Sequence, residues 1–286
     1  MYREILVPFD GSDLAERARS YAITLARGGH ARLRLMRVVP AAQFTPIVPL
    51  AGYAVPQALG DAEKARRDAE AYLSGLVILE AGESSVETVV YAGDPALLIA
   101  DEARSRSVDL IVMATHGRSG LEEWVEGSVA GAVIRDSSVP VLVIPRGCQQ
   151  DWSKQNDARL LVLLDGSALS QEILGPAVDL SQVRRAEITL LRVVAPGTSA
   201  DAQEYLDVIA ADLRKQRPRI EARVVEANDP VTAILAVAQD QQVDAIALAT
   251  HGRGGLARLL MGSFARALLH QANVPVLLYR PASILS

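Results

Sequence analysis

The amino-acid sequence repeats itself, and this repeat constrains the fold more than any other feature. An apolar run that ends in Asp-Gly-Ser occurs at 5–12 and again at 160–167. Ala-Thr-His-Gly-Arg occurs at 114–118 and again at 249–253. Further blocks match in the same order at 33–39 and 188–194, 93–96 and 228–231, 127–128 and 262–263, and 139–143 and 274–278. The repeat has the length of a domain, so the sequence predicts a tandem duplication.

The repeat predicts one domain at 1–146 and a second at 158–281, joined by a linker at 147–157. The linker is polar and shows no periodicity. It contains the single cysteine, Cys148, which we expect to be an exposed thiol without special reactivity. The first copy also carries a Pro- and Ala-rich stretch at about 40–60 that the second lacks, and a lid, a partner surface and a disordered excursion all fit it.

Apolar runs alternate with amphipathic segments in each copy. In the first copy we expect strands near 3–9, 32–39, 85–91, 108–114 and 139–144, and helices near 12–28, 61–79, 95–106 and 127–137. The strands are continuously apolar, as expected where helices cover both faces of a sheet. The fold class is therefore α/β, with two tandem doubly wound five-stranded parallel sheets of strand order 3-2-1-4-5, a Rossmann-like, HUP-like arrangement.

The most distinctive repeated residues mark the place where such a fold binds ligands. An open parallel sheet binds ligands beyond the carboxyl ends of its strands, where the strand order reverses. For the order 3-2-1-4-5 this point lies between strands 1 and 4. Asp10 and Asp165 follow the first strand of each copy, and Thr-His-Gly follows the fourth at 115–117 and 250–252. We therefore expect one ligand site in each half.

The chemistry of these residues favours a nucleotide. Gly117 allows backbone N–H groups to face an anion, and a Gly-Ser pair at 127–128 and at 262–263 opens the last helix of each half. The aspartate is an acceptor for an exocyclic amine or a ribose hydroxyl. Taken singly, Gly-Ser is also a plain helix cap and Asp-Gly-Ser an ordinary turn. Their joint occurrence, twice and at the same spacing, favours a nucleotide pocket.

Several other function classes find no support in the sequence. The net charge of −5 and the lack of a basic arm argue against nucleic acid or membrane surfaces as partners. Neither a Gly-x-x-x-x-Gly-Lys-Ser/Thr loop nor Gly-x-Gly-x-x-Gly occurs. No nucleophile–base pair or metal-ligand cluster stands out, and we interpret His116 and His251 as turn-fixing residues, so we expect a protein that is not an enzyme. One cysteine and strand-sized apolar runs favour a cytoplasmic location.

These motifs resemble the universal stress protein family in its tandem two-domain form. ATP-binding members carry Gly-x-x-Gly, nine residues, and then Gly-Ser or Gly-Thr. Here Gly117 is followed after nine residues by Gly127-Ser128, and Gly252 by Gly262-Ser263. The first glycine of the motif is replaced by alanine in both copies, at Ala114 and Ala249.

The resemblance implies ATP as the ligand, with Mg²⁺ bound through the phosphates and at most slow hydrolysis or autophosphorylation. Asp10 and Asp165 would contact the adenine end. The backbone at Val38 and Val193 would line the base pocket with Met113 and Leu248, although simple strand core explains these last two residues equally well. The full set of expected nucleotide-binding residues is Pro8, Asp10, Val38, Met113, Ala114, His116, Gly117, Gly127, Ser128, Val129, Asp165, Val193, Leu248, Ala249, His251, Gly252, Gly262, Ser263 and Phe264.

The resemblance also implies partners. The last strands of the two copies, 139–144 and 274–279, are expected sheet edges, and apolar edges favour pairing. The two halves would join through them as an intramolecular pseudo-dimer, and two chains would be able to form a homodimer. The function that follows is that of an ATP-binding regulatory protein of the stress response. The alternative is an interaction scaffold of the stress response with non-binding or degenerate pockets.

Overall fold

The computed structural model describes residues 1–39, 56–78, 85–115, 129–154, 158–215, 219–250 and 262–280. The first half contains β1 (Glu4–Phe9), α1 (Asp13–Gly29), β2 (Arg32–Val39), α2 (Pro56–Ile78), β3 (Val86–Ala92), α3 (Pro95–Ser105), β4 (Leu110–Ala114), α4 (Val129–Asp136) and β5 (Val141–Ile144). The second contains β6 (Arg159–Leu163), α5 (Ala168–Gln171), α6 (Leu174–Arg184), β7 (Glu187–Val194), α7 (Ser199–Arg214), β8 (Ile220–Glu226), α8 (Pro230–Asp240), β9 (Ala245–Ala249), α9 (Ser263–Gln271) and β10 (Val276–Tyr279). The helices and strands predicted for the first copy are thus confirmed, apart from shifts of a few residues at their ends.

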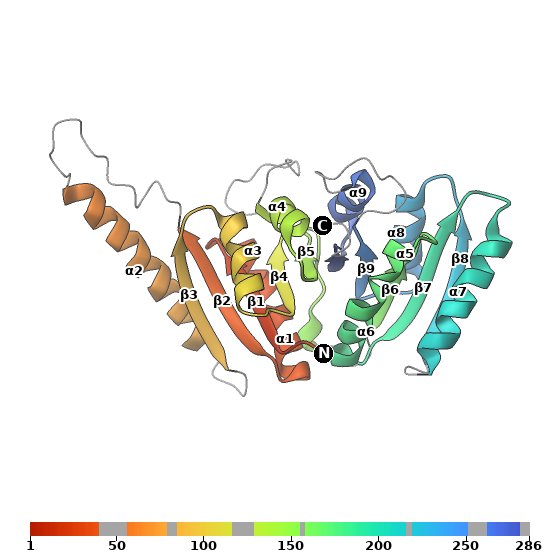
Figure 1. Cartoon of the computed structure of the whole chain (residues 1–286), viewed down its shortest axis with the longest axis horizontal. Helices are drawn as coiled ribbons and strands as arrows, with labels where there is room; N and C mark the ends of the chain where they lie inside the picture. The colour runs from red at the N-terminus through yellow and green to blue at the C-terminus, as the bar shows by residue number, and fades with distance from the viewer. Residues whose placement is uncertain are drawn as a thin grey trace.

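Ten strands form one continuous sheet in the order β3-β2-β1-β4-β5-β10-β9-β6-β7-β8 (Figure 1). Each half therefore has the predicted order 3-2-1-4-5, and all neighbouring strands within a half are parallel. In the centre, β5 and β10 pair antiparallel, with Leu142 opposite Leu277. The two halves are joined through the predicted edge strands, so neither of these edges is left unpaired.

Helices cover both faces of the sheet, as the continuously apolar strands predicted. One apolar core lies under α1, α2, α6 and α7, and the other lies under α3, α4, α8 and α9. Successive residues of β1 point to opposite faces, so Ile5 belongs to the first core and Leu6 to the second. Each core contains side chains from both halves. The duplicated domains therefore share their buried interior.

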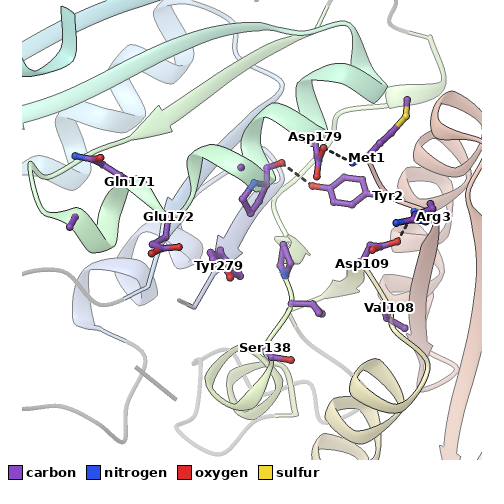
Figure 2. Close-up of a pocket in the computed structure, with 15 residues that line it drawn as sticks. Met1, Tyr2, Arg3, Val108, Asp109, Ser138, Gln171, Glu172, Asp179 and Tyr279 are labelled. Carbon is purple, nitrogen blue, oxygen red and sulfur yellow. Dashed lines mark hydrogen bonds and ion pairs between the residues drawn. The ribbon is translucent and has the colours of Figure 1, made fainter. Parts of the chain in front are cut away.

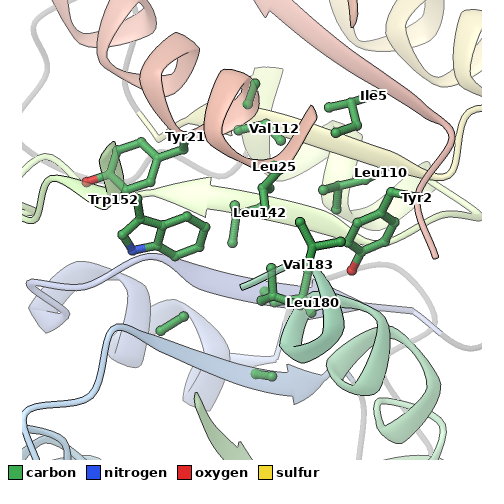
Figure 3. Close-up of a cluster of buried hydrophobic side chains, with 14 of the residues drawn as sticks. Tyr2, Ile5, Tyr21, Leu25, Leu110, Val112, Leu142, Trp152, Leu180 and Val183 are labelled. Atoms are coloured by element: carbon green, nitrogen blue, oxygen red, sulfur yellow. The ribbon is translucent and has the colours of Figure 1, made fainter. Parts of the chain in front are cut away.

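The junction between the halves is built on α1 and α6 (Figure 3). Tyr21 and Leu25 of α1 pack in the same buried cluster as Leu180 and Val183 of α6. The close approach of the two helices depends on Gly28. A Cβ atom at this position would lie 2.8 Å from the carbonyl oxygen of Val183, which is closer than such atoms approach in proteins. Glycine is therefore required by the packing of the two halves.

The linker differs from our prediction, because two of its described residues, Cys148 and Trp152, are buried in the junction. Cys148 is fully buried, and Trp152, in a short 3-10 helix (Trp152–Lys154), is 2% exposed. The Tyr21 hydroxyl lies 3.1 Å from the Cys148 sulfur and donates to the Gln150 carbonyl at 2.5 Å. The prediction of an exposed thiol was therefore wrong. A stretch this short shows no hydrophobic periodicity from which burial could be predicted. The two neighbouring domains supply the surface that covers Cys148 and Trp152.

Two prolines determine where helices begin and break. α2 begins at Pro56 rather than near 61, and proline suits the first turn of a helix because its missing N–H is not needed there. The rest of the extra stretch, 40–55, lies outside the described residues. In the second half, α5 and α6 replace the continuous α1. Pro176 has no N–H to donate to the Glu172 carbonyl, so the helix is interrupted at 172–173, between α5 and α6.

Candidate functional site

The first Asp-Gly-Ser turn holds a carboxylate at the carboxyl end of β1. The Asp10 carboxylate accepts hydrogen bonds from the Ser12 backbone N–H at 2.9 Å and from the Ser12 hydroxyl at 2.6 Å. Ser12 in turn caps α1, because its hydroxyl oxygen accepts from the Ala15 N–H at 3.2 Å. Gly11 has φ +81°, a conformation that favours glycine. Because β1 pairs with both β2 and β4, this turn lies at the predicted reversal point of the sheet.

The second copy repeats the hydrogen bonds that hold this turn. Asp165 accepts from the Ser167 N–H at 2.8 Å and from its hydroxyl at 2.6 Å. Ser167 caps α5 by accepting from the Ser170 N–H at 3.1 Å, and Gly166 has φ +89°. The turn follows β6, which pairs with β7 and β9. The duplication has therefore preserved a specific hydrogen-bonded geometry.

The residues expected around the base come from the strands beside each turn. Val38 on β2 and Val193 on β7 are partly buried against the core under α3, α4, α8 and α9. Met113 on β4 and Leu248 on β9 are 5% and 3% exposed and belong to the same core. The remaining members of this group are Pro8 within β1, and Ala114 and Ala249 as the last residues of β4 and β9.

The residues expected around the phosphates are described in part. Gly262 directly precedes α9 as its N-cap residue, and among the described residues no side chain caps this helix. Its first two residues are Ser263 and the exposed Phe264; Val129, the repeat equivalent of Phe264, is the first residue of α4. An uncapped helix start presents backbone N–H groups and the positive end of the helix dipole. The other members of this set, His116, Gly117, Gly127, Ser128, His251 and Gly252, lie outside the described residues.

Sequence analysis missed two side chains at the turns, Arg37 and Arg192. They occupy equivalent positions near the carboxyl ends of β2 and β7, next to Val38 and Val193. Each guanidinium occupies the space that a Cβ atom at the glycine of the neighbouring Asp-Gly-Ser turn would need. The signal was present, because an arginine interrupts the same apolar run in both copies.

A groove of about 750 Å³ lies at the junction of the two halves, away from the Asp10 turn (Figure 2). It is lined by Met1, Tyr2, Arg3, Val108, Asp109, Ser138, Val139, Pro140, Ala168, Gln171, Glu172, Gly175, Pro176, Asp179 and Tyr279. The first half contributes the amino ends of β1 and β4, whereas Asp10 lies at the carboxyl end of β1. The groove is therefore distinct from the predicted site of the first half.

The position that corresponds to this groove on the other side of the junction is occupied by the described part of the linker. The repeat places Val243 where Val108 lies, and the Gln150 side-chain amide donates to the Val243 carbonyl at 2.9 Å. On the open side, the Tyr2 hydroxyl donates to the Pro176 carbonyl at 3.0 Å. Burial, followed by the nearby charges of Asp179 and Asp109, raises the pKa of Tyr2 far above its usual range, so it stays protonated. The linker thus breaks the two-fold symmetry of the halves.

The described ranges hold neither a metal-ligand cluster nor a membrane-spanning helix. Within them, no group of three or more His, Cys, Asp or Glu side chains is arranged to hold a metal ion. None of the helices in these ranges is long and apolar enough to cross a membrane.

Comparison with known proteins places this fold and these turns in a family. Residues 1–145 and 158–280 each match the model of the universal stress protein family. The chain belongs to this family. As a universal stress protein it carries two copies of the family domain, in agreement with the resemblance seen in its motifs.

Relatives of this universal stress protein occur in bacteria and archaea. The Bacillus subtilis universal stress protein YxiE is 33% identical over 156 residues, covering 50% of this chain and 99% of that protein. A Mycobacterium tuberculosis universal stress protein is 29% identical over 191 residues, covering 62% of this chain and 63% of that protein. The crystal structure of an Archaeoglobus fulgidus universal stress protein has a TM-score of 0.73 at 19% identity, covering 97% and 98% of the two chains. This last likeness supports the fold alone.

Proposed function

We propose that this universal stress protein binds ATP at the carboxyl ends of β1 and β6 and acts as a cytoplasmic, non-enzymatic regulator of the stress response. The observation that supports this proposal best is the duplicated acceptor turn. Asp10 and Asp165 hold the same pair of hydrogen bonds at the same reversal point of the two half-sheets.

The surrounding residues suit the parts of a nucleotide. A carboxylate at the end of β1 or β6 accepts hydrogen bonds from an exocyclic amine or a ribose hydroxyl. The uncapped start of α9 at Gly262 suits phosphate oxygens, because its N–H groups point outward along the helix axis. Mg²⁺ would be bound through the phosphates.

Bound ATP would act by changing the associations of the protein. Occupancy of the two sites would change how the protein associates with itself or with a target, and homodimer formation stays a prediction of the family resemblance. The shared cores give the halves a physical means of influencing each other, since a change at one turn is transmitted through packed helices rather than a loose linker.

The first test identifies the natural ligand and counts its sites. Freshly purified protein is denatured, and any released nucleotide is identified by chromatography and mass, with its molar ratio to the chain. ATP near two per chain supports two working sites, and ATP near one supports a single working site. No nucleotide, together with no binding of added MgATP, contradicts the proposal and leaves an interaction scaffold with non-binding pockets.

Asp10→Ala and Asp165→Ala then test the turns by calorimetric titration with MgATP. Each substitution removes an ionised hydrogen-bond acceptor, which contributes about 1.5–3 kcal/mol, so affinity at its own site falls about 10- to 100-fold. Asp94→Ala and Asp229→Ala are the matched controls. Both aspartates cap helices, α3 and α8, but follow the outer strands β3 and β8 rather than the reversal point. Equal losses in all four variants would indicate a general effect on helix ends.

A further inference from the structure

Each Asp-Gly-Ser turn is covered by an arginine that comes from the adjacent strand. A Cβ atom at Gly11 would lie 3.0 Å from Nη2 and 3.1 Å from Nη1 of Arg37. A Cβ atom at Gly166 would lie 2.6 Å from Nη2 of Arg192. The guanidinium therefore occupies the space that any other side chain at the glycine would need. In both copies the middle residue of the turn is closed off from one side.

A tyrosine holds each of these arginines in place. The Arg37 ζ-carbon lies 4.6 Å from the ring centroid of Tyr72 on α2, which is cation–π distance. The Tyr72 hydroxyl donates to Glu16 of α1 at 2.9 Å. Burial, and then this hydrogen bond, raise the pKa of Tyr72 far above its usual range, so the phenol remains a donor. Glu16 lies one helical turn beyond Ser12, which caps α1 and bonds to Asp10.

These contacts form a closed ring from the turn through α1, α2 and β2 back to the turn. The second copy has the same ring. Arg192 lies 5.1 Å from the ring centroid of Tyr205 on α7, and the Gln171 side-chain amide donates to the Tyr205 hydroxyl at 3.2 Å, so this hydrogen bond runs in the opposite direction to that of Tyr72. Gln171 occupies the repeat position of Glu16. The number of residues between arginine and tyrosine differs in the two copies, because the first half carries the extra stretch at about 40–60.

We propose that Arg37 and Arg192 are positioning residues of the two nucleotide sites, which act by holding the Asp-Gly-Ser turn and its carboxylate in the geometry that receives the ligand. This inference rests on the proposed function. The glycine at the centre of each turn has wide conformational freedom, so an unsupported turn would have to be ordered each time a nucleotide binds. A guanidinium fixed between the turn and an aromatic ring supplies this order beforehand.

The planar shape of arginine is part of the role. Lysine keeps the charge, but its ammonium group is a compact point charge that cannot stack on an aromatic ring as a guanidinium does. Arg37→Lys is therefore expected to behave like Arg37→Ala rather than like the wild type. A role that depended on charge alone would be rescued by lysine.

The experiment combines two measurements on the full-length protein: hydrogen exchange of the turn amides, and calorimetric affinity for MgATP. Arg37→Ala should lose protection at the Ser12 and Ala15 amides and weaken one ATP site on the order of tenfold. Arg192→Ala should do the same at Ser167 and Ser170, so each half serves as the internal control for the other. Arg32→Ala is the matched control, because Arg32 lies at the opposite end of β2 and pairs with Glu4.

The possible outcomes separate the two proposals. Loss of protection together with loss of affinity, unrescued by lysine, supports the role. If wild-type protein binds ATP and Arg37→Ala leaves its affinity unchanged, the positioning role is overturned while the proposed function stands. If wild-type protein binds no ATP, the proposed function fails and the positioning role fails with it. If Arg32→Ala weakens ATP binding equally, the effect belongs to β2 as a whole, and the role is also overturned.

Discussion

At the residue scale, burial decides what a charged side chain contributes. The Arg34 side chain is 11% exposed and forms ion pairs with Glu4 at 3.1 Å, Glu87 at 2.6 Å and Glu102 at 3.3 Å. Glu4 and Glu102 are themselves buried. The repeat places Thr189 where Arg34 stands, so the second half is built without this arginine. The ion pairs are therefore a feature of the first half and not a requirement of the fold.

Arg34→Met should lower the free energy of unfolding by about 3 kcal/mol, because it removes the buried cation that Glu4 and Glu102 share and leaves them only the exposed Arg32 and Arg106. Arg66→Met is the matched control. Arg66 also pairs with two glutamates, Glu63 at 3.6 Å and Glu70 at 3.4 Å, but its side chain is 52% exposed. Exposed pairs contribute about 0–1 kcal/mol, so little should change. Urea denaturation measures both variants, and similar small effects would show that the Arg34 ion pairs do not stabilise the first half.

At the scale of elements, the contact of α1 with α6 decides how the halves fit. Gly28→Ala would favour α1 by about 0.5–1 kcal/mol through helix propensity. It would also press a methyl group against the Val183 carbonyl, and overpacking of this kind costs about 1–3 kcal/mol. We therefore expect a net loss of stability in urea denaturation.

Gly75→Ala in α2 is the control for this prediction. A Cβ atom at Gly75 meets nothing within 4 Å, so only the gain in helix propensity should remain, about 0.5–1 kcal/mol. The two substitutions are identical and differ only in their surroundings. A gain of stability in both variants would mean that α1 and α6 can move apart without cost.

At the scale of the whole molecule, the shared cores predict one cooperative unfolding transition rather than two. Cys148 reports this directly, because it is buried between the halves and is the single cysteine of the chain. Thiol labelling of Cys148 and the far-UV circular dichroism signal should have the same urea midpoint. Labelling at a clearly lower urea concentration would show that the linker leaves the junction before the domains unfold.

The family resemblance implied the central pairing of the last strands, whereas the sequence by itself determined the fold class, the strand order and the two Asp-Gly-Ser turns. These features depend on local signals, which repeat: apolar runs of strand length, a serine that caps a helix, and a glycine that allows positive φ. The duplication strengthened every one of them, because a pattern that occurs twice in the same order is far less ambiguous than one that occurs once. The assignment of the ATP site to these turns stays a proposal.

Only the tertiary structure decided the burial of Cys148 and Trp152, the ion pairs of Arg34, and the rings that join Arg37 to Tyr72 and Arg192 to Tyr205. The partners in these contacts lie on different elements, far apart in the chain. Periodicity reports which side of a strand or helix faces the interior, but not which distant residue will be met there. That depends on how the two halves pack into one sheet with common cores, and this packing is a property of the assembled molecule.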